Sequence, residues 1–129
     1  MKEISLKTRK RVELIDITLE VEKAVSESKI KEGVALIFVP HTTAAITINE
    51  NADPSVKIDV LHFLNQLVPE NGNYLHSEGN SDAHIKSSLI GCEKLIPISE
   101  GKLVLGTWQG IIFCEFDGPR NRRVFVQIK

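Results

Sequence analysis

Three of the four histidines stand in an expected loop or where a strand or helix is expected to begin or end. His41 follows an apolar run and a proline, and two hydroxyl residues, Thr42 and Thr43, come directly after it. His76 lies in a polar stretch, and His84 opens a short helical pattern. Binding and catalytic residues concentrate at such positions because a rigid scaffold holds them there. The pattern predicts either a shared site or separate hydrogen-bonded residues.

Convergence of these histidines would create a metal site. Three neutral imidazoles, from His41, His76 and His84, would hold a divalent ion of the zinc or magnesium class and leave one position open. Their spacing matches no sequential metal-binding signature, so the hypothesis of a metal site requires the fold to bring the three histidines together. His62 follows Leu61 of an expected helical stripe, and we expect it at the surface or partly buried, outside the cluster.

The densest positive charge follows a turn that begins at Asp117. Arg120, Arg122 and Arg123 come directly after this Asp-Gly-Pro turn. The forked donors of arginine fit phosphate or carboxylate oxygens, so we expect an anion contact at Arg120, with Gly118 and Arg122 beside it. The alternatives are a solvated hairpin end, or an Arg120 that pairs with a carboxylate such as Asp117 to hold the turn.

A lone tryptophan forms a third candidate site. Trp108 and Gln109 lie between two glycines in the expected strand over residues 103–116. Glycine within a strand often marks a close approach by a ligand or another backbone. These side chains are therefore expected to line a pocket or to pack against another subunit.

Two carboxylates near His41 are weaker candidates. Asp53 precedes a proline and an apolar helical stripe, which is typical of a helix N-cap. Glu50 is a possible hydrogen-bonding partner for an imidazole ring.

Composition bounds the class of protein. The chain has 129 residues, 42% of them hydrophobic and 26% charged, which is typical of one soluble globular domain over residues 1–129. A net charge of −1 predicts neither nucleic-acid nor membrane partners. The charged N-terminal stretch lacks the apolar core of a signal peptide. Cys92 and Cys114 show no paired motif, so we expect two core cysteines and a cytoplasmic location.

Periodicity predicts the elements that must position these residues. Apolar residues at helical spacing predict helices over residues 18–28, 54–68 and 81–91. Alternating or continuous apolar runs predict strands, and the run over residues 34–39 is expected to be covered on both faces. Strands dominate the second half, which predicts an α+β fold: a largely antiparallel (mixed) sheet with helices packed on one face.

Three blocks resemble a known family. The stretches HTTAAITINENADPSV, DAHIKSSLIG and GKLVLGTWQGIIFCEFDGPRNRRV look like the YjbQ-like family, also called the secondary thiamine-phosphate synthase family. The resemblance covers nearly the whole chain. It implies an α+β fold, a homotrimer and a site near the subunit boundaries.

The resemblance also implies an activity. The family's reaction joins hydroxymethylpyrimidine pyrophosphate to thiazole phosphate and releases pyrophosphate, so the expected partner is a small phosphorylated substrate. We assign catalysis to four residues: His41, His76, His84 and Arg120. We assign substrate binding to seven: Thr42, Thr43, Trp108, Gln109, Gly118, Arg120 and Arg122. A metal-dependent hydrolase of a phosphorylated compound and a non-catalytic trimer that binds a metal or small anion are the alternatives.

Overall fold

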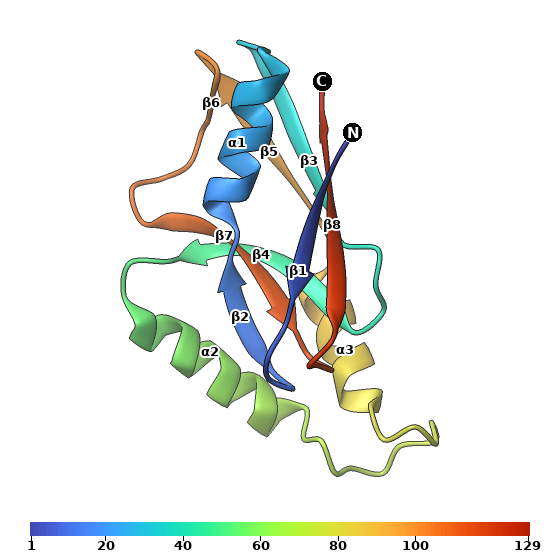
Figure 1. Ribbon diagram of the computed structural model, residues 1–129. Coiled ribbons are helices and arrows are strands. Elements are labelled where there is room, and N and C mark those ends of the chain that lie inside the picture. Colours follow the sequence, from blue (N-terminus) through green and yellow to red (C-terminus); the bar gives the residue numbers. More distant parts are fainter.

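Eight strands and three helices make up the chain, and the computed structural model describes residues 1–129 (Figure 1). The strands are β1 (Lys2–Lys7), β2 (Glu13–Asp16), β3 (Gly33–Phe38), β4 (Ala44–Glu50), β5 (Glu93–Ser99), β6 (Lys102–Leu103), β7 (Gln109–Glu115) and β8 (Asn121–Ile128). The helices are α1 (Thr18–Ser28), α2 (Pro54–Leu67) and α3 (Ser81–Ile90). None of the three helices combines the length and the apolar character that crossing a membrane requires.

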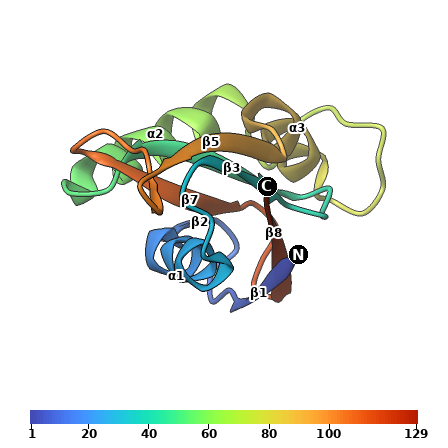
Figure 2. The same ribbon diagram turned by 90° about the horizontal axis from the view of Figure 1, so that it is seen from above.

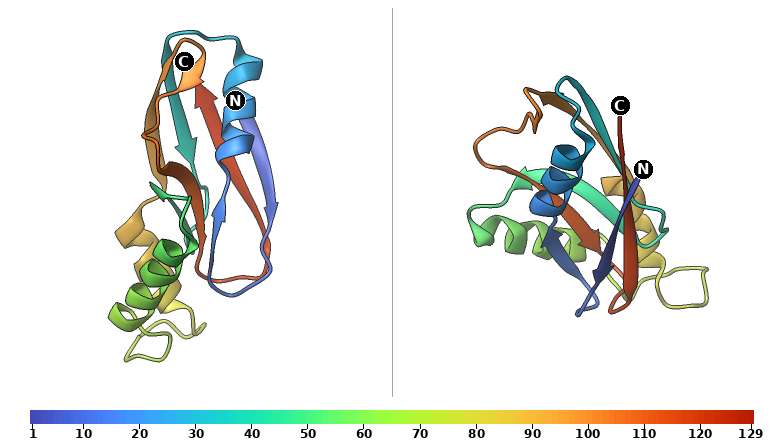
Figure 3. Two further views of the ribbon diagram at one scale, coloured as in Figure 1. Left: turned by 90° about the vertical axis from the view of Figure 1, so that its left-hand side faces the viewer. Right: turned by 45° about the horizontal axis from the view of Figure 1, so that its top comes forward.

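The strands form two sheets in which every pairing is antiparallel. The larger sheet has the order β1-β8-β3-β5-β6, and the smaller has the order β2-β7-β4. Both termini lie at the end of the molecule opposite to α2 and α3 (Figure 3). The predicted single-domain α+β class and antiparallel pairing are confirmed, although the strands divide into two sheets.

The main core lies between the two sheets and α1. Its twelve buried side chains come from α1, from five strands and from the residues directly before α1 and after β3: Ile17, Val21, Ala24, Ile37, Val39, Ala44, Ile46, Ile96, Ile111, Phe113, Val124 and Val126. A second, smaller core joins α2 and α3 to the other face of the small sheet through residues such as Leu64, Ala83 and Cys114. Accordingly, α1 lies on one side of the sheets, and α2 and α3 lie on the other (Figure 2), so the expectation that the helices pack on one face is wrong.

The predicted helices are confirmed, and local chemistry explains where two of them begin. The Asp53 carboxylate accepts a hydrogen bond from the backbone N–H of Ser55 at 2.9 Å, while Pro54 occupies the first turn. The Asp16 carboxylate accepts from the backbone N–H of Thr18 at 2.9 Å at the start of α1. Both carboxylates accept hydrogen bonds from backbone N–H groups that have no partner within the helix.

The expected single strand over residues 103–116 is wrong. Strand β6 ends at Leu103 and β7 begins at Gln109, with an exposed loop between them. The Gly106 N–H donates to Oε1 of Gln109 at 2.7 Å, and this bond closes a turn. Trp108 therefore lies in a loop, with 62% of its surface exposed.

The expectation that β3 is covered on both faces is also wrong. Alternate residues of β3 are buried, but Val34, Leu36 and Phe38 are 37%, 38% and 40% exposed. Leu95 of β5, directly opposite Leu36, is 64% exposed. The outer face of the large sheet thus carries an uncovered apolar patch, defined by these four residues, because no helix of the chain packs on it.

Buried charges hold α3 in place. Asp82 and Lys86 are at most 1% exposed, and Nζ of Lys86 donates to Asp82 at 3.2 Å and to Asn65 of α2 at 2.7 Å. The Arg11 guanidinium donates to both oxygens of Asp82, at 3.2 and 3.0 Å. Burial alone would raise the pKa of Asp82, but hydrogen bonds from Arg11 and Lys86 outweigh it and lower the pKa. This network joins α3 to α2 and to the β1–β2 connection.

Replacing Asp82 with asparagine should destabilise the fold by about 3–5 kcal/mol, because Lys86 would remain buried without its counter-charge. Urea unfolding at pH 7 measures the change. Because the folded-state pKa of Asp82 is lowered, its contribution to the free energy of unfolding is present above about pH 4 and is lost at lower pH. The asparagine variant cannot titrate at this position and should lack this pH dependence. Asp59→Asn, on the exposed side of α2, is the control and should change stability by less than about 0.5 kcal/mol. Equal effects of the two variants would contradict the prediction.

Candidate functional site

His41 is held at one end of the large sheet. It lies between β3 and β4, and its Nε2 accepts a hydrogen bond from the backbone N–H of Arg123 in β8 at 3.0 Å. Partial burial lowers the pKa of His41, and the charges of Arg122 and Arg123 lower it further, while the Glu115 carboxylate has a smaller opposite effect. These effects favour the neutral form of the ring at pH 7.

His84 shares a cavity with His41. The cavity has a volume of about 510 Å³, and we call it the His41 cavity. Its lining comes from the β3–β4 connection, from α3, and from the segment that leads from α3 into β5: His41, Thr42, His84, Ser87, Ser88, Gly91, Cys92 and Glu93. Helical spacing of three and four residues aligns Ser87 and Ser88 with His84. His41, Thr42 and His84 thus line the same cavity within one chain.

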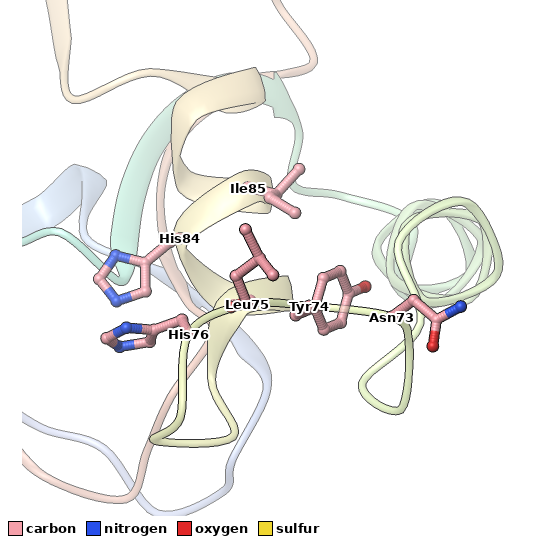
Figure 4. Close-up of a pocket in the computed structure, with 7 residues that line it drawn as sticks. Asn73, Tyr74, Leu75, His76, His84 and Ile85 are labelled. Carbon is pink, nitrogen blue, oxygen red and sulfur yellow. The ribbon is translucent and has the colours of Figure 1, made fainter.

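A second cavity also has His84 in its lining (Figure 4). This His76 cavity has a volume of about 420 Å³ and is lined by Asn73, Tyr74, Leu75, His76, Ser81, His84 and Ile85. The rings of His76 and His84 meet edge to face, with centroids 5.4 Å apart and planes at 85°. His84 therefore belongs to both cavities and links His76 to His41.

The three histidines do not form a metal site within the single chain. No group of three or more His, Cys, Asp or Glu side chains is arranged to hold an ion. Nε2 of His41 is also engaged by Arg123, so its lone pair is not free for a metal. These donors do not fit a divalent ion as they stand, and a metal remains a prediction. His62 is exposed on α2 and lines neither cavity, as expected.

Arg122 and Thr43, both expected to contact substrate, instead bind each other in the interior. Nη2 of Arg122 donates to the carbonyl and hydroxyl oxygens of Thr43 at 3.2 and 2.8 Å. Its Nε donates to both carboxylate oxygens of Glu115 at 2.9 and 3.2 Å. Burial would raise the pKa of Glu115, but hydrogen bonds from Arg122 and Thr8 lower it. A buried charge requires such a partner, which explains why Arg122 faces inward.

Arg120 and Gly118 serve the turn. Arg120 donates from Nε to the Asp117 carbonyl at 2.8 Å and from Nη2 to its carboxylate at 3.0 Å. This is the pairing that the alternative interpretation predicted. A Cβ at Gly118 would lie 2.3 Å from the Lys10 carbonyl oxygen, so glycine is required here by a close approach of backbone rather than of ligand.

Trp108 and Gln109 lie far from the histidines. The register of β4 and β7 places Ala44 opposite Glu115 and Glu50 opposite Gln109. At about 3.3 Å per residue, six steps along β4 separate the two ends by about 20 Å. Within one chain, neither the tryptophan loop nor Glu50 can reach the His41 cavity.

Cys92 is a lining residue that the sequence patterns did not indicate. It is half-buried, and its thiol donates to the Glu93 carboxylate at 3.1 Å, which together with burial raises the pKa of Cys92. The expectation of a core cysteine is therefore wrong for Cys92. It holds for Cys114, where burial raises the pKa to about 12. Both cysteines are unpaired.

Comparison with known proteins identifies the family. The UPF0047 protein YjbQ-like family model matches residues 2–129. A UPF0047 protein of Methanocaldococcus jannaschii is 64% identical over 123 residues, covering 95% of this chain and 89% of that protein. YugU of Bacillus subtilis is 52% identical over 129 residues, covering 99% of this chain and 98% of that protein. The crystal structure of an uncharacterized family member from Clostridium acetobutylicum has a TM-score of 0.99 and 58% identity, with 100% of both chains covered. The chain therefore belongs to the UPF0047 YjbQ-like family.

Proposed function

We propose that this protein is an enzyme that binds phosphorylated small molecules in the His41 and His76 cavities, with thiamine-phosphate synthase-type transfer as its reaction. The observation that carries the proposal is the sharing of His84 between two cavities of about 510 and 420 Å³. Two adjoining cavities suit a reaction that joins two substrates. A hydrolase of one phosphorylated compound would need only one of them.

The reaction requires no covalent bond between the substrates and the protein. The ring nitrogen of thiazole phosphate attacks the methylene carbon of the pyrimidine, and the new C–N bond forms as the C–O bond to pyrophosphate breaks. The bonding electrons leave with pyrophosphate, and the thiazolium product carries the positive charge. Catalysis therefore consists of holding the two rings together and stabilising charge on the leaving group. The imidazole N–H groups that line the two cavities suit the second task.

Self-association is part of the proposal. We propose a homotrimer in which another copy covers the uncovered apolar patch on β3 and β5, because such an apolar sheet face is favourably removed from water. Assembly would also offer a means of bringing the tryptophan loop of one copy to the histidines of another. Two unpaired cysteines favour a reducing compartment, so we place the protein in the cytoplasm.

A coupled assay tests the activity. Purified protein is incubated with hydroxymethylpyrimidine pyrophosphate and thiazole phosphate, and thiamine phosphate is measured by mass spectrometry. We expect product, and we expect His84→Ala to reduce its rate at least about tenfold, because one positioned donor is worth that much or more. The exposed His62→Ala is the control and should leave the rate unchanged.

The same assay separates the alternatives. Release of phosphate from either substrate without a coupled product would favour the hydrolase, and binding without turnover would favour the non-catalytic trimer. Loss of activity in a chelator, restored by zinc or magnesium, would support the predicted metal.

The apolar patch can be tested by charge. Leu36→Glu places a carboxylate in the middle of the patch and should convert the trimer to monomer in sedimentation at micromolar concentration, because an unpaired charge opposes burial. Leu19→Glu, on the exposed side of α1, where Leu19 is 77% exposed, is the matched control. A wild-type protein that sediments as a monomer would contradict the homotrimer.

The pairing with Asp117 makes a prediction about Arg120. A half-exposed ion pair contributes up to about 1 kcal/mol, so Arg120→Ala should lower the melting temperature by about 3–5 °C. Affinity for inorganic phosphate, measured by calorimetry, should change less than about threefold. A tenfold loss of phosphate affinity at an unchanged melting temperature would instead support Arg120 as an anion contact. In that case Arg120→Lys should show a similar loss of affinity.

A further inference from the structure

His41 differs from an ordinary exposed histidine because one ring nitrogen is already committed. Its Nε2 accepts from the backbone N–H of Arg123 at 3.0 Å, and its Nδ1 makes no hydrogen bond within the chain. A neutral imidazole carries a single hydrogen, and a nitrogen that accepts from an N–H group cannot carry it. The hydrogen must therefore lie on Nδ1.

We infer that His41 is fixed as the Nδ1–H tautomer and acts as a hydrogen-bond donor, so that the group it binds in the His41 cavity is a phosphate-type oxyanion and not a metal ion. The inference rests on the proposed function for the identity of the oxyanion, which is the phosphate or pyrophosphate group of a substrate. The tautomer itself rests on the fold alone.

Sheet geometry explains why the bond to Arg123 exists. The ladder between β3 and β8 ends at the pair Phe38–Phe125, because the chain leaves the sheet after β3. The Arg123 N–H lies two residues beyond the last β8 residue of that ladder, and a backbone donor needs an acceptor. The His41 ring supplies the acceptor that the departing β3 does not. Rotating the ring to bind a metal through Nε2 would leave this donor unpaired.

The charges that act most strongly on the ring oppose a cation at His41. Arg122 and Arg123 of β8 are the main charges that act on the ring, and both oppose a second positive charge there. The Glu115 carboxylate of β7 is already paired with Arg122. Across the cavity, Glu93 of β5 accepts from the Cys92 thiol, and His84 of α3 is the other titratable group.

Nitrogen NMR tests the tautomer directly. Long-range proton–nitrogen correlation on ¹⁵N-labelled wild-type protein at pH 7.5 should give His41 a protonated Nδ1 and an unprotonated Nε2, with the signals assigned by their loss in His41→Ala. An unconstrained histidine prefers the opposite tautomer, so the exposed His62 is an internal reference. A protonated Nε2 at His41 would overturn the inference. This measurement needs no activity, so its failure is distinct from failure of the proposed transfer reaction.

Ligand titration tests the oxyanion. Inorganic phosphate should bind His41→Ala about tenfold or more weakly than wild type, because a hydrogen bond to a charged group is lost. His41→Asn, whose amide can place a donor near the position of Nδ1, should retain affinity within about threefold. Zinc affinity should be equal in wild type and His41→Ala. A variant that loses zinc binding but keeps phosphate binding would overturn the inference, and thermal melting of each variant checks its folding.

Discussion

The buried ion pair between Glu115 and Arg122 is the interaction on which the site depends. It joins the last residue of β7, in the small sheet, to the start of β8, in the large sheet. Separating the pair would cost considerable free energy, because each charge is buried and would lose its counter-charge. Thr8 and Thr43 add hydrogen bonds from two further segments. Four distant parts of the chain are thereby fixed at one point, and the next residue, Arg123, orients His41.

The second constraint is the position of α3. His84 reaches both cavities only because Asp82 and Lys86 hold the helix against α2 and the β1–β2 connection. Two buried polar networks therefore support the site. The network around Glu115 and Arg122 positions His41, and the network around Asp82 and Lys86 positions His84. Such networks are costly when incomplete, so they favour a single arrangement of the side chains that they position. The cavities themselves are open at the surface, which suits the entry of small, charged substrates.

Local patterns were sufficient for much of the fold. The helices beginning after Asp16 and Asp53 could be predicted because caps, prolines and apolar spacing act within a few residues of one another. The division into two sheets could not, since strand pairing joins residues that are far apart in the chain. The apolar composition of β3 led to the wrong prediction that both of its faces are covered. Composition does not distinguish a face covered by the same chain from a face left exposed. Trp108 was misplaced for a related reason: a turn closed by the Gln109 side chain interrupts an apolar run.

The sequence by itself determined the types of chemical group available: imidazoles in a loop and at the ends of elements, a cluster of arginines after a turn, and a tryptophan between glycines. Only the tertiary structure decided which of them meet. It brought His41 to His84, and His84 to His76, but it turned Arg122 inward to Glu115 and tied Arg120 to Asp117. It also separated Trp108 from the histidines by the length of β4. The physical reason is that a buried arginine must find a carboxylate and a strand must keep its register, and neither requirement can be read from the spacing of residues along the chain.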